Sequence, residues 1–151
     1  MLDSICFSSW VERGDIISDS VITGSQFFEE QYGYNEAKDG FQCKKENKYT
    51  YIAANLESTW FEVDLKKIVT LKCVKVATRF PDYYFTNVEF RFGNESQDGD
   101  YFKNPLIAFS GSEPKHVFEF CLDYSVVGKY LGLRQNFHTY LIVGEIQIIL
   151  K

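Results

Sequence analysis

Apolar and polar residues alternate along much of this chain, most clearly at residues 58–65. Phe61, Val63 and Leu65 share one parity there, whereas Glu62 and Asp64 share the other. Because successive side chains of a strand point to opposite sides, a period of two predicts a β-strand with one buried face. We interpret this segment as the strand around which the rest of the chain is laid.

Strand patterns recur on both sides of this segment. Residues 69–79 are rich in β-branched residues and apolar on both parities, which predicts a central strand covered on both faces. Further strands are predicted at residues 15–25, 49–53, 86–92, 116–122, 128–134 and 140–150. Residues 26–34 and 95–105 are interpreted as loops, with one helical turn as the alternative for 26–34. Many short strands separated by turn signals predict one all-β domain over residues 1–151, an antiparallel β-sandwich of jelly-roll type.

Composition narrows the function classes. Aromatic residues make up 17% of the chain, which favours pleated, half-buried surfaces. The net charge is -5 and no Lys/Arg run could follow a phosphate backbone, so a nucleic-acid partner is not expected. No apolar stretch is long enough for a transmembrane helix, and the first ten residues do not have the pattern of a signal peptide.

The four cysteines are widely spaced at Cys6, Cys43, Cys73 and Cys121. They form no C-x-x-C pair, so a zinc site is poorly supported, and four cysteines allow three full pairings. Cys73 and Cys121 lie in strand-like runs, and we interpret them as small buried hydrophobic residues. Asn94-Glu95-Ser96 matches the N-glycosylation tripeptide, which suits a secreted loop but also occurs by chance.

Two loops carry candidate ligand contacts. The first is marked by proline and combines an arginine with acidic and aromatic side chains: Arg79, Asp82, Tyr83 and Tyr84. An aromatic face can cover the C–H surface of a sugar while an Arg or Asp fixes its hydroxyls. The alternative is an Arg–Asp turn pair over a packed aromatic cluster. The second loop is a polar hairpin before the last strand, with Arg134, Asn136 and His138. No nucleophile elbow is present, and nothing in the sequence favours catalysis, so a non-enzymatic role is expected.

Four ordered blocks resemble the discoidin family, the type C domains of coagulation factors, and their lectin relatives the fucolectins. The blocks are Glu36-Ala37-Lys38-Asp39-Gly40, Trp60-Phe61-Glu62-Val63-Asp64-Leu65, Asn87-Val88-Glu89-Phe90-Arg91-Phe92-Gly93-Asn94, and Gly128-Lys129-Tyr130-Leu131 with Gly144-Glu145-Ile146. The resemblance implies a sandwich of the galactose-binding jelly-roll type. It also implies a module that binds sugars, lipid head groups or proteins through loops at one end.

In several of these relatives a calcium ion joins the first block to the last strand. Carried over by resemblance, the ligands would be Glu36, Asp39, Phe41, Thr50, Gly144 and Glu145. This mixture of carboxylate, hydroxyl and carbonyl oxygens suits calcium. The alternative is that Asp39 only forms a turn before Gly40 and Glu145 only faces solvent.

The fucolectins hold fucose with a histidine and two basic residues, and this chain matches that set only in part. Arg79 occupies the place of the first arginine, but no histidine lies between Phe41 and Thr59, and no Lys or Arg lies between Phe80 and Val88. Cys121 matches a disulfide cysteine of the family, but its usual partner near Asn104-Pro105 is missing, so the family disulfide is not expected.

The expected function is therefore carbohydrate binding, with a glycan or glycoprotein as partner and an extracellular or cell-surface location. Oligomers or tandem copies would strengthen weak single sites through avidity. The alternative is a protein-interaction or adhesion module that uses the same loops and binds no sugar.

Overall fold

The computed structural model describes most of the central and C-terminal chain. The described residues are 20–24, 51–52, 59–78, 84, 86–96, 103–135, 141–143 and 145–151, with the backbone alone described for residues 51, 52, 142 and 145. Eight strands occur in these ranges: β1 Val21–Gly24, β2 Tyr51–Ile52, β3 Thr59–Ala77, β4 Val88–Gly93, β5 Leu106–Phe109, β6 Val117–Gln135, β7 Ile142–Val143 and β8 Glu145–Leu150. None of the described residues forms a helix long and apolar enough to cross a bilayer.

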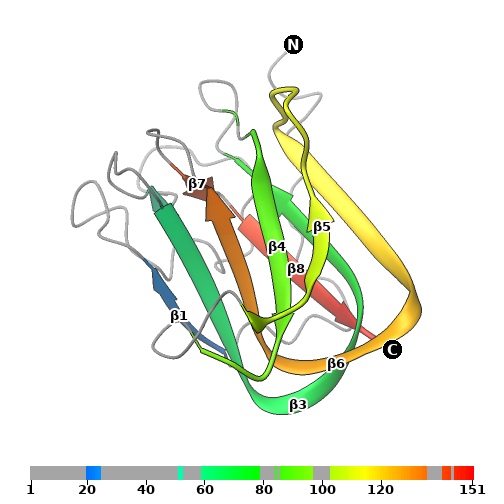
Figure 1. The fold of residues 1–151 in the computed structure, drawn as a ribbon. Coiled ribbons are helices and arrows are strands. Elements are labelled where there is room, and N and C mark those ends of the chain that lie inside the picture. The colour runs from blue at the N-terminus through cyan, green and yellow to red at the C-terminus, as the bar shows by residue number, and fades with distance from the viewer. Residues whose placement is uncertain are drawn as a thin grey trace.

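Two long strands, β3 and β6, build most of the sheet and run through both of its layers. They pair antiparallel along their whole length, with Thr59 opposite Gln135 at one end and Ala77 opposite Val117 at the other. Each strand bends near its middle, so all four ends emerge at the same end of the molecule (Figure 1). We call this end the loop pole and the opposite end, where the strands turn, the bend pole.

The bends divide the sheet into two facing layers, as expected for a β-sandwich. In the first layer the strand order is β1, the first half of β3, the second half of β6, β4 and β5. In the second layer β8 lies beside the second half of β3, which pairs on its other side with the first half of β6. A separate antiparallel pair joins β2 to β7. Every described pairing is antiparallel, so the predicted all-β antiparallel architecture is confirmed.

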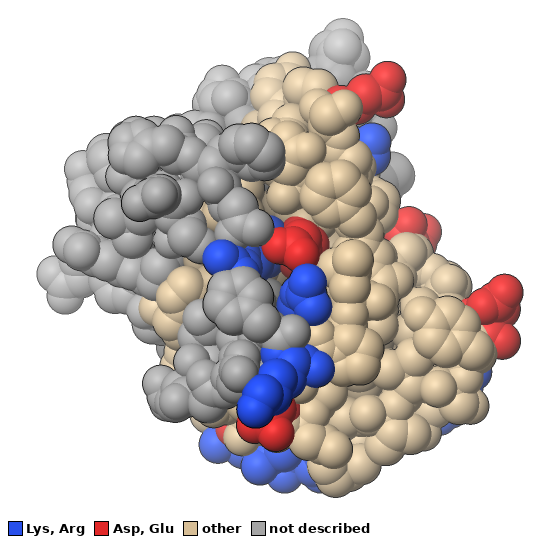
Figure 2. Space-filling view, viewed as in Figure 1, with Lys and Arg blue, Asp and Glu red and all other residues tan. Residues whose placement is uncertain are grey.

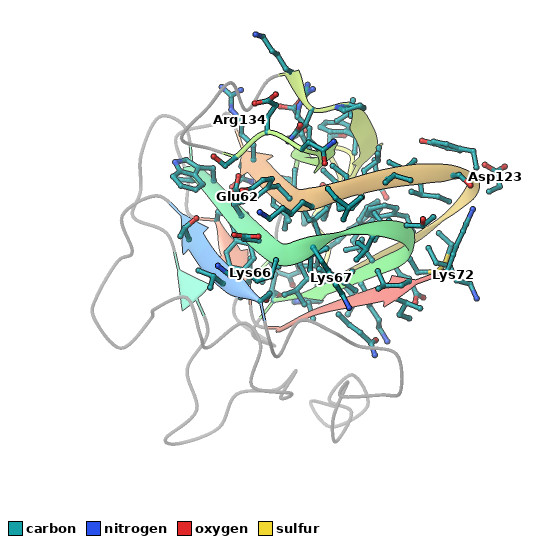
Figure 3. The ribbon with its side chains drawn as sticks, turned by 90° about the horizontal axis from the view of Figure 1, so that it is seen from below. Glu62, Lys66, Lys67, Lys72, Asp123 and Arg134 are labelled. Carbon is teal, nitrogen blue, oxygen red and sulfur yellow. A yellow bond between two sulfur atoms is a disulfide. The ribbon has the colours of Figure 1, made fainter. Side chains whose placement is uncertain are left out.

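Each bend has extra residues on one strand. Between the pairs Asp64–Tyr130 and Val69–Gly128, β3 contributes residues 65–68 whereas β6 contributes only Lys129. Between Leu71–Val126 and Cys73–Cys121 the excess is reversed, with residues 122–125 of β6 opposite Lys72 of β3. Such bulges strengthen the local twist, which turns both strands from one layer into the other. Figure 3 shows Lys66 and Lys67 on one bend and Asp123 on the other.

The core lies between the layers and consists of the residues that the alternating pattern selects. Phe61 and Val63 are fully buried, as are Phe90 and Phe92 of β4. From the other layer Leu71, Val74, Val76, Ile146 and Ile148 complete this core. The predicted inward parity is therefore confirmed for residues 59–65 and 86–92, and for Ile146 and Ile148 of the last strand. Before β8 the prediction was wrong, because Leu141 and Val143, which have the opposite parity, are buried.

The strand boundaries differ from those predicted. Residues 59–65 and 69–77 lie in two separately predicted strands but belong to the continuous strand β3, and residues 117–122 and 128–134 likewise belong to β6. The predicted final strand is divided into β7 and β8, and only residues 21–24 of the first predicted strand are described as strand. No strand was predicted for residues 66–68 and 123–127 at the bends, whereas the bulges keep the backbone paired on either side of them.

The interpretation of Cys73 and Cys121 as unpaired buried residues was wrong, because the two form a disulfide across β3 and β6. They are register partners, and their Cα atoms lie 4.1 Å apart. Opposite residues in an antiparallel pair project to the same side and bring their side chains close. Cys121 is exposed and its neighbours Phe120 and Leu122 pack toward the core, so the bridge lies on the outer face of its layer.

The prediction of an exposed loop at residues 95–105 was also wrong in part. Asn104 is only 3% exposed, and β5 begins two residues later although no strand was predicted there. Asn104 accepts a hydrogen bond from the Glu95 backbone N–H and donates one to the Glu95 carbonyl. A single buried amide therefore ties the beginning and end of this segment together.

Candidate functional site

The loop pole collects chain segments that are far apart in the sequence. In the first layer β3 begins at Thr59 beside the last residue of β6, Gln135. In the second layer β3 finishes at Ala77 beside the first residue of β6, Val117. β4 begins at the same pole because Val88 pairs with Gln135. The segment between β3 and β4, which holds the first predicted ligand loop, therefore leaves and re-enters the sandwich here (Figure 1).

An aromatic pair lies at this pole. The ring of Tyr84 packs against the ring of His116, with centroids 4.1 Å apart and planes tilted by 35°. Tyr84 is 51% exposed, so this contact covers only part of its surface. The two residues come from different segments, since Tyr84 lies between β3 and β4 and His116 immediately precedes β6.

Thr78 fixes the position of His116. The Thr78 backbone N–H donates a 2.8 Å hydrogen bond to the His116 carbonyl, which extends the β3–β6 pairing by one step. Thr78 is buried, and its Oγ1 lies 3.5 Å from His116 Nδ1. His116 thus stands on the rigid end of the sheet.

Two buried side-chain oxygens lie beneath this pole. Thr59 and Gln135 are register partners whose side chains face inward, on the same parity as Phe61 and Leu133. Gln135 Nε2 donates to the Thr86 carbonyl, but within the described part of the chain Gln135 Oε1 and Thr59 Oγ1 are buried without a hydrogen-bond partner. Buried polar atoms are normally satisfied, by ordered water where no protein group is available. The pole therefore has polar atoms under it that remain open to a further hydrogen bond.

Arg134 lies on a different surface from Tyr84. Leu133 faces the core, so its neighbour Arg134 projects from the outer face of the first layer, where its register partners are Trp60 and Glu89. On the same face Arg91 pairs with Glu89 at 2.9 Å and donates to the Asn104 carbonyl. Figure 2 views this layer from outside and shows basic and acidic side chains close together on it.

This charged surface differs from the predicted hairpin. Arg134 and Gln135 belong to β6 itself, and Gln135 is buried rather than part of a polar loop. Glu62, expected on an open polar face, is only 5% exposed. Its carboxylate is therefore covered although it points away from the core, and Figure 3 shows Glu62 and Arg134 on neighbouring strands.

Most predicted ligand residues lie outside the described part of the chain. These are Arg79, Asp82, Tyr83, Asn136 and His138 in the candidate sugar site, and Glu36, Asp39, Phe41, Thr50 and Gly144 in the candidate calcium site. Glu145 is described by its backbone alone, as the first residue of β8 opposite Ala77. Within the described ranges no group of three or more His, Cys, Asp and Glu side chains could hold a metal ion.

Sequence reasoning missed His116, to which no role was given. The available signal was its place directly before an alternating apolar segment, because a residue that precedes a strand lies at a pole of the sandwich. The contact with Tyr84 depends on the fold of the intervening segments, which no local pattern reports.

Comparisons with known proteins point to one fold. No family model matches the chain, and no curated protein matches it either. Among solved structures, a fucolectin from the serum of the striped bass Morone saxatilis has a TM-score of 0.79 at 18% identity. The match covers 89% of this chain but 48% of the fucolectin, so the chain spans about half of that protein's length.

Two further structures match over nearly their whole length. The lectin domain of lectinolysin, in complex with the Lewis b antigen, has a TM-score of 0.74 at 18% identity, with 93% of this chain and 99% of that chain covered. A family 32 carbohydrate-binding module of C. perfringens, in complex with galactose, has a TM-score of 0.71 at 15% identity, with 89% and 97% covered.

The chain has the fold of these lectin modules. The predicted resemblance to the discoidin and fucolectin group is thereby confirmed at the level of the galactose-binding jelly roll. In this jelly roll the loop pole and the outer face of the first layer are separate surfaces, and Tyr84 and His116 lie at the former.

Proposed function

We propose that this chain is a non-enzymatic carbohydrate-binding module that takes a glycan or glycoprotein at its loop pole, outside the cell. The observation that supports this proposal is the Tyr84–His116 pair, in which a half-exposed tyrosine ring is held at the end of a rigid sheet. An exposed ring can cover the apolar C–H face of a sugar.

Polar groups next to this ring would supply the hydrogen bonds that distinguish one sugar from another. Arg79 follows Thr78 directly, and Asp82 and Tyr83 precede Tyr84 in the same short segment. Guanidinium donors and carboxylate acceptors complement the adjacent hydroxyls of a sugar ring. In this proposal Arg79 and Asp82 orient the sugar, and Asn136 and His138 contact it from the neighbouring segment.

The neighbours support this class of ligand. Among the similar structures are a fucolectin, a lectin domain bound to Lewis b and a module bound to galactose. The disulfide between Cys73 and Cys121 supports an extracellular location, because disulfides persist in oxidising compartments.

A glycan array probed with the purified chain tests the proposal, with Arg79→Ala as the site variant. Lys72→Ala is the matched control, since it also removes one positive charge but lies at the bend pole. We expect the wild type and Lys72→Ala to bind the same glycans and Arg79→Ala to lose them. Silence of the folded wild type across the array would contradict the proposal.

We further propose that calcium joins the segment around Asp39 to the last strands. β2 pairs with β7 so that Tyr51 lies opposite Val143, and these residues adjoin the proposed ligands Thr50 and Gly144 in the sequence. The donor set of Glu36, Asp39, Phe41, Thr50, Gly144 and Glu145 is made of the oxygens that calcium prefers. When bound, calcium would supply a structural cross-link.

Calorimetry with calcium alone, together with thermal unfolding in the presence and absence of a chelator, tests the calcium site without any glycan. We expect heat of binding and a chelator-sensitive midpoint in the wild type, and neither in Asp39→Asn. The glycan array is then repeated with chelator. Unchanged binding would indicate a purely structural calcium ion, and lost binding would indicate an ion that glycan binding needs. Absence of both heat and midpoint shift in the wild type would contradict the site.

One observation favours a protein partner as the second candidate function. β5 pairs with β4 on one side, and its Leu106 and Phe109 are 49% and 51% exposed. Exposed apolar side chains on a short strand at the end of a sheet can accept a partner's strand. Affinity capture that is lost in Phe109→Ala and kept in Arg79→Ala would favour this second function over the first.

A further inference from the structure

A single Asn-X-Ser/Thr tripeptide, Asn94-Glu95-Ser96, occurs in the 151 residues. It begins directly after β4, whose last residue Gly93 pairs with Tyr130 of β6. Asn94 forms a bend and its side chain is exposed. The sugar-binding proposal makes no use of this tripeptide, so its role is a separate question.

The bend that presents Asn94 is anchored by a buried amide. Asn104 Oδ1 accepts from the Glu95 N–H at 3.1 Å, and Asn104 Nδ2 donates to the Glu95 carbonyl at 2.7 Å. These bonds use the backbone of the middle residue of the tripeptide. The hydrogen bonds that hold the bend therefore leave the Asn94 carboxamide pointing to solvent.

Two glycines pack tightly under the same bend. A Cβ on Gly93 would lie 2.4 Å from Asn104 Oδ1, and a Cβ on Gly128 would lie 2.8 Å from the Gly93 Cα. Both positions therefore require glycine, because β4 passes against β6 and Asn104 without space for a side chain. The backbone before Asn94 is thus a fixed base, and a large group on its side chain would project outward without displacing the core.

The disulfide gives an independent indication of the compartment. Cys73 and Cys121 are bonded across adjacent strands, and such bonds persist mainly in oxidising compartments. Asn-X-Ser/Thr tripeptides in surface loops of secreted proteins are the acceptors of N-linked glycans. The structure thus combines the acceptor sequence, an exposed acceptor side chain and the matching compartment.

We propose that Asn94 is an N-glycosylation site. In the transfer, the Asn94 carboxamide nitrogen forms a bond to the anomeric carbon of a lipid-linked oligosaccharide diphosphate. The bond from that carbon to the diphosphate oxygen breaks, and its electron pair leaves with the lipid diphosphate. The amide nitrogen loses one proton, which the released diphosphate or solvent takes up. No oxidant or reductant takes part.

The position of Asn94 keeps the glycan away from the proposed sugar site. β4 begins at the loop pole, where Val88 pairs with Gln135, and ends at Gly93, toward the bend pole. Its length corresponds to roughly 17 Å at about 3.4 Å per residue. A glycan on Asn94 would therefore cover surface near the bend pole and leave Tyr84 and His116 open.

Secretion of the full chain from a eukaryotic cell line behind a heterologous signal peptide tests this proposal. Intact mass and peptide mapping are measured before and after treatment with a peptide N-glycosidase, which leaves an aspartate at position 94 where a glycan has been. Asn94→Gln and Ser96→Ala each remove the acceptor sequence, and Ser96→Thr keeps it. Thermal unfolding of each secreted product checks that the variants are folded.

The expected result is one N-linked glycan per chain in the wild type and in Ser96→Thr, and none in the other two variants. Removing the glycan from folded wild type is expected to leave glycan-array binding unchanged. Folded, disulfide-bonded wild-type protein in the medium without a glycan at position 94 would overturn the proposal. If Ser96→Thr also carried no glycan at position 94, poor recognition of serine in the acceptor sequence could not explain the missing glycan.

Discussion

Two groups of aromatic rings in this molecule are held in different ways. Phe90, Phe118 and Phe120 contact one another between the layers with centroids 5.1–5.8 Å apart, and Phe90 is fully buried. Tyr84 and His116 lie closer together, at 4.1 Å, yet Tyr84 is half exposed at the loop pole. The hydrophobic effect follows the area removed from water, so the first group stabilises the fold and the second leaves apolar surface exposed at the loop pole.

The largest expected effect on stability comes from the buried group. Phe90→Ala removes a fully buried ring and leaves a cavity, so we expect the free energy of unfolding to fall by about 3–5 kcal/mol. Phe109→Ala is the matched control, because this phenylalanine is 51% exposed on β5. Its expected change is within about 0.5 kcal/mol. Denaturant unfolding measures both, and equal losses would show that exposure does not distinguish the two rings.

The disulfide is expected to rank next. It closes a loop of sequence separation 48, for which chain entropy gives a stabilisation of about 4 kcal/mol. We expect Cys73→Ser combined with Cys121→Ser to lose about 2–4 kcal/mol in denaturant unfolding. Wild-type protein under reducing conditions should match the double variant, and a double variant as stable as oxidised wild type would contradict this role.

A smaller effect is expected from the buried amide of Asn104 near the bend pole. Asn104→Ala removes both hydrogen bonds to the Glu95 backbone, at an expected cost of about 1–3 kcal/mol. Asn94→Ala is the control, because it changes an exposed asparagine of the same segment. Only the buried residue should lower the unfolding midpoint, and a loss shared by both variants would show that the bend depends on Asn94 as well.

Sequence pattern predicted the layers better than the connections between them. Parity identified Phe61, Phe90 and Ile146 as core residues, because alternation records which side of a strand is buried. It could not show that β3 and β6 continue through their bends, since bulges place polar residues in the middle of a strand. The Cys73–Cys121 bridge was missed because the register between two strands far apart in the sequence is not visible in the sequence of either strand.

The candidate site was predictable only where local chemistry marks it. Tyr84 was predicted as a ligand residue because it lies in an aromatic segment after a proline, and the fold places it at the loop pole. Arg134 was grouped with that site by its polar neighbours, but the alternation of β6 directs it to an outer face. His116 was not predicted because its contact with Tyr84 and its bond to Thr78 arise from tertiary structure.

The most direct test compares two half-exposed tyrosines. Tyr84 is 51% exposed at the loop pole and Tyr124 is 52% exposed at the bend pole, so replacing either by alanine removes a similar surface. For the glycan that the array identifies, titration calorimetry should show Tyr84→Ala binding at least about tenfold more weakly, a loss of about 1.4 kcal/mol. Its unfolding free energy should change by less than about 1 kcal/mol. Tyr124→Ala should bind like wild type. Undiminished affinity in a folded Tyr84→Ala variant would contradict a ligand site built on the exposed ring.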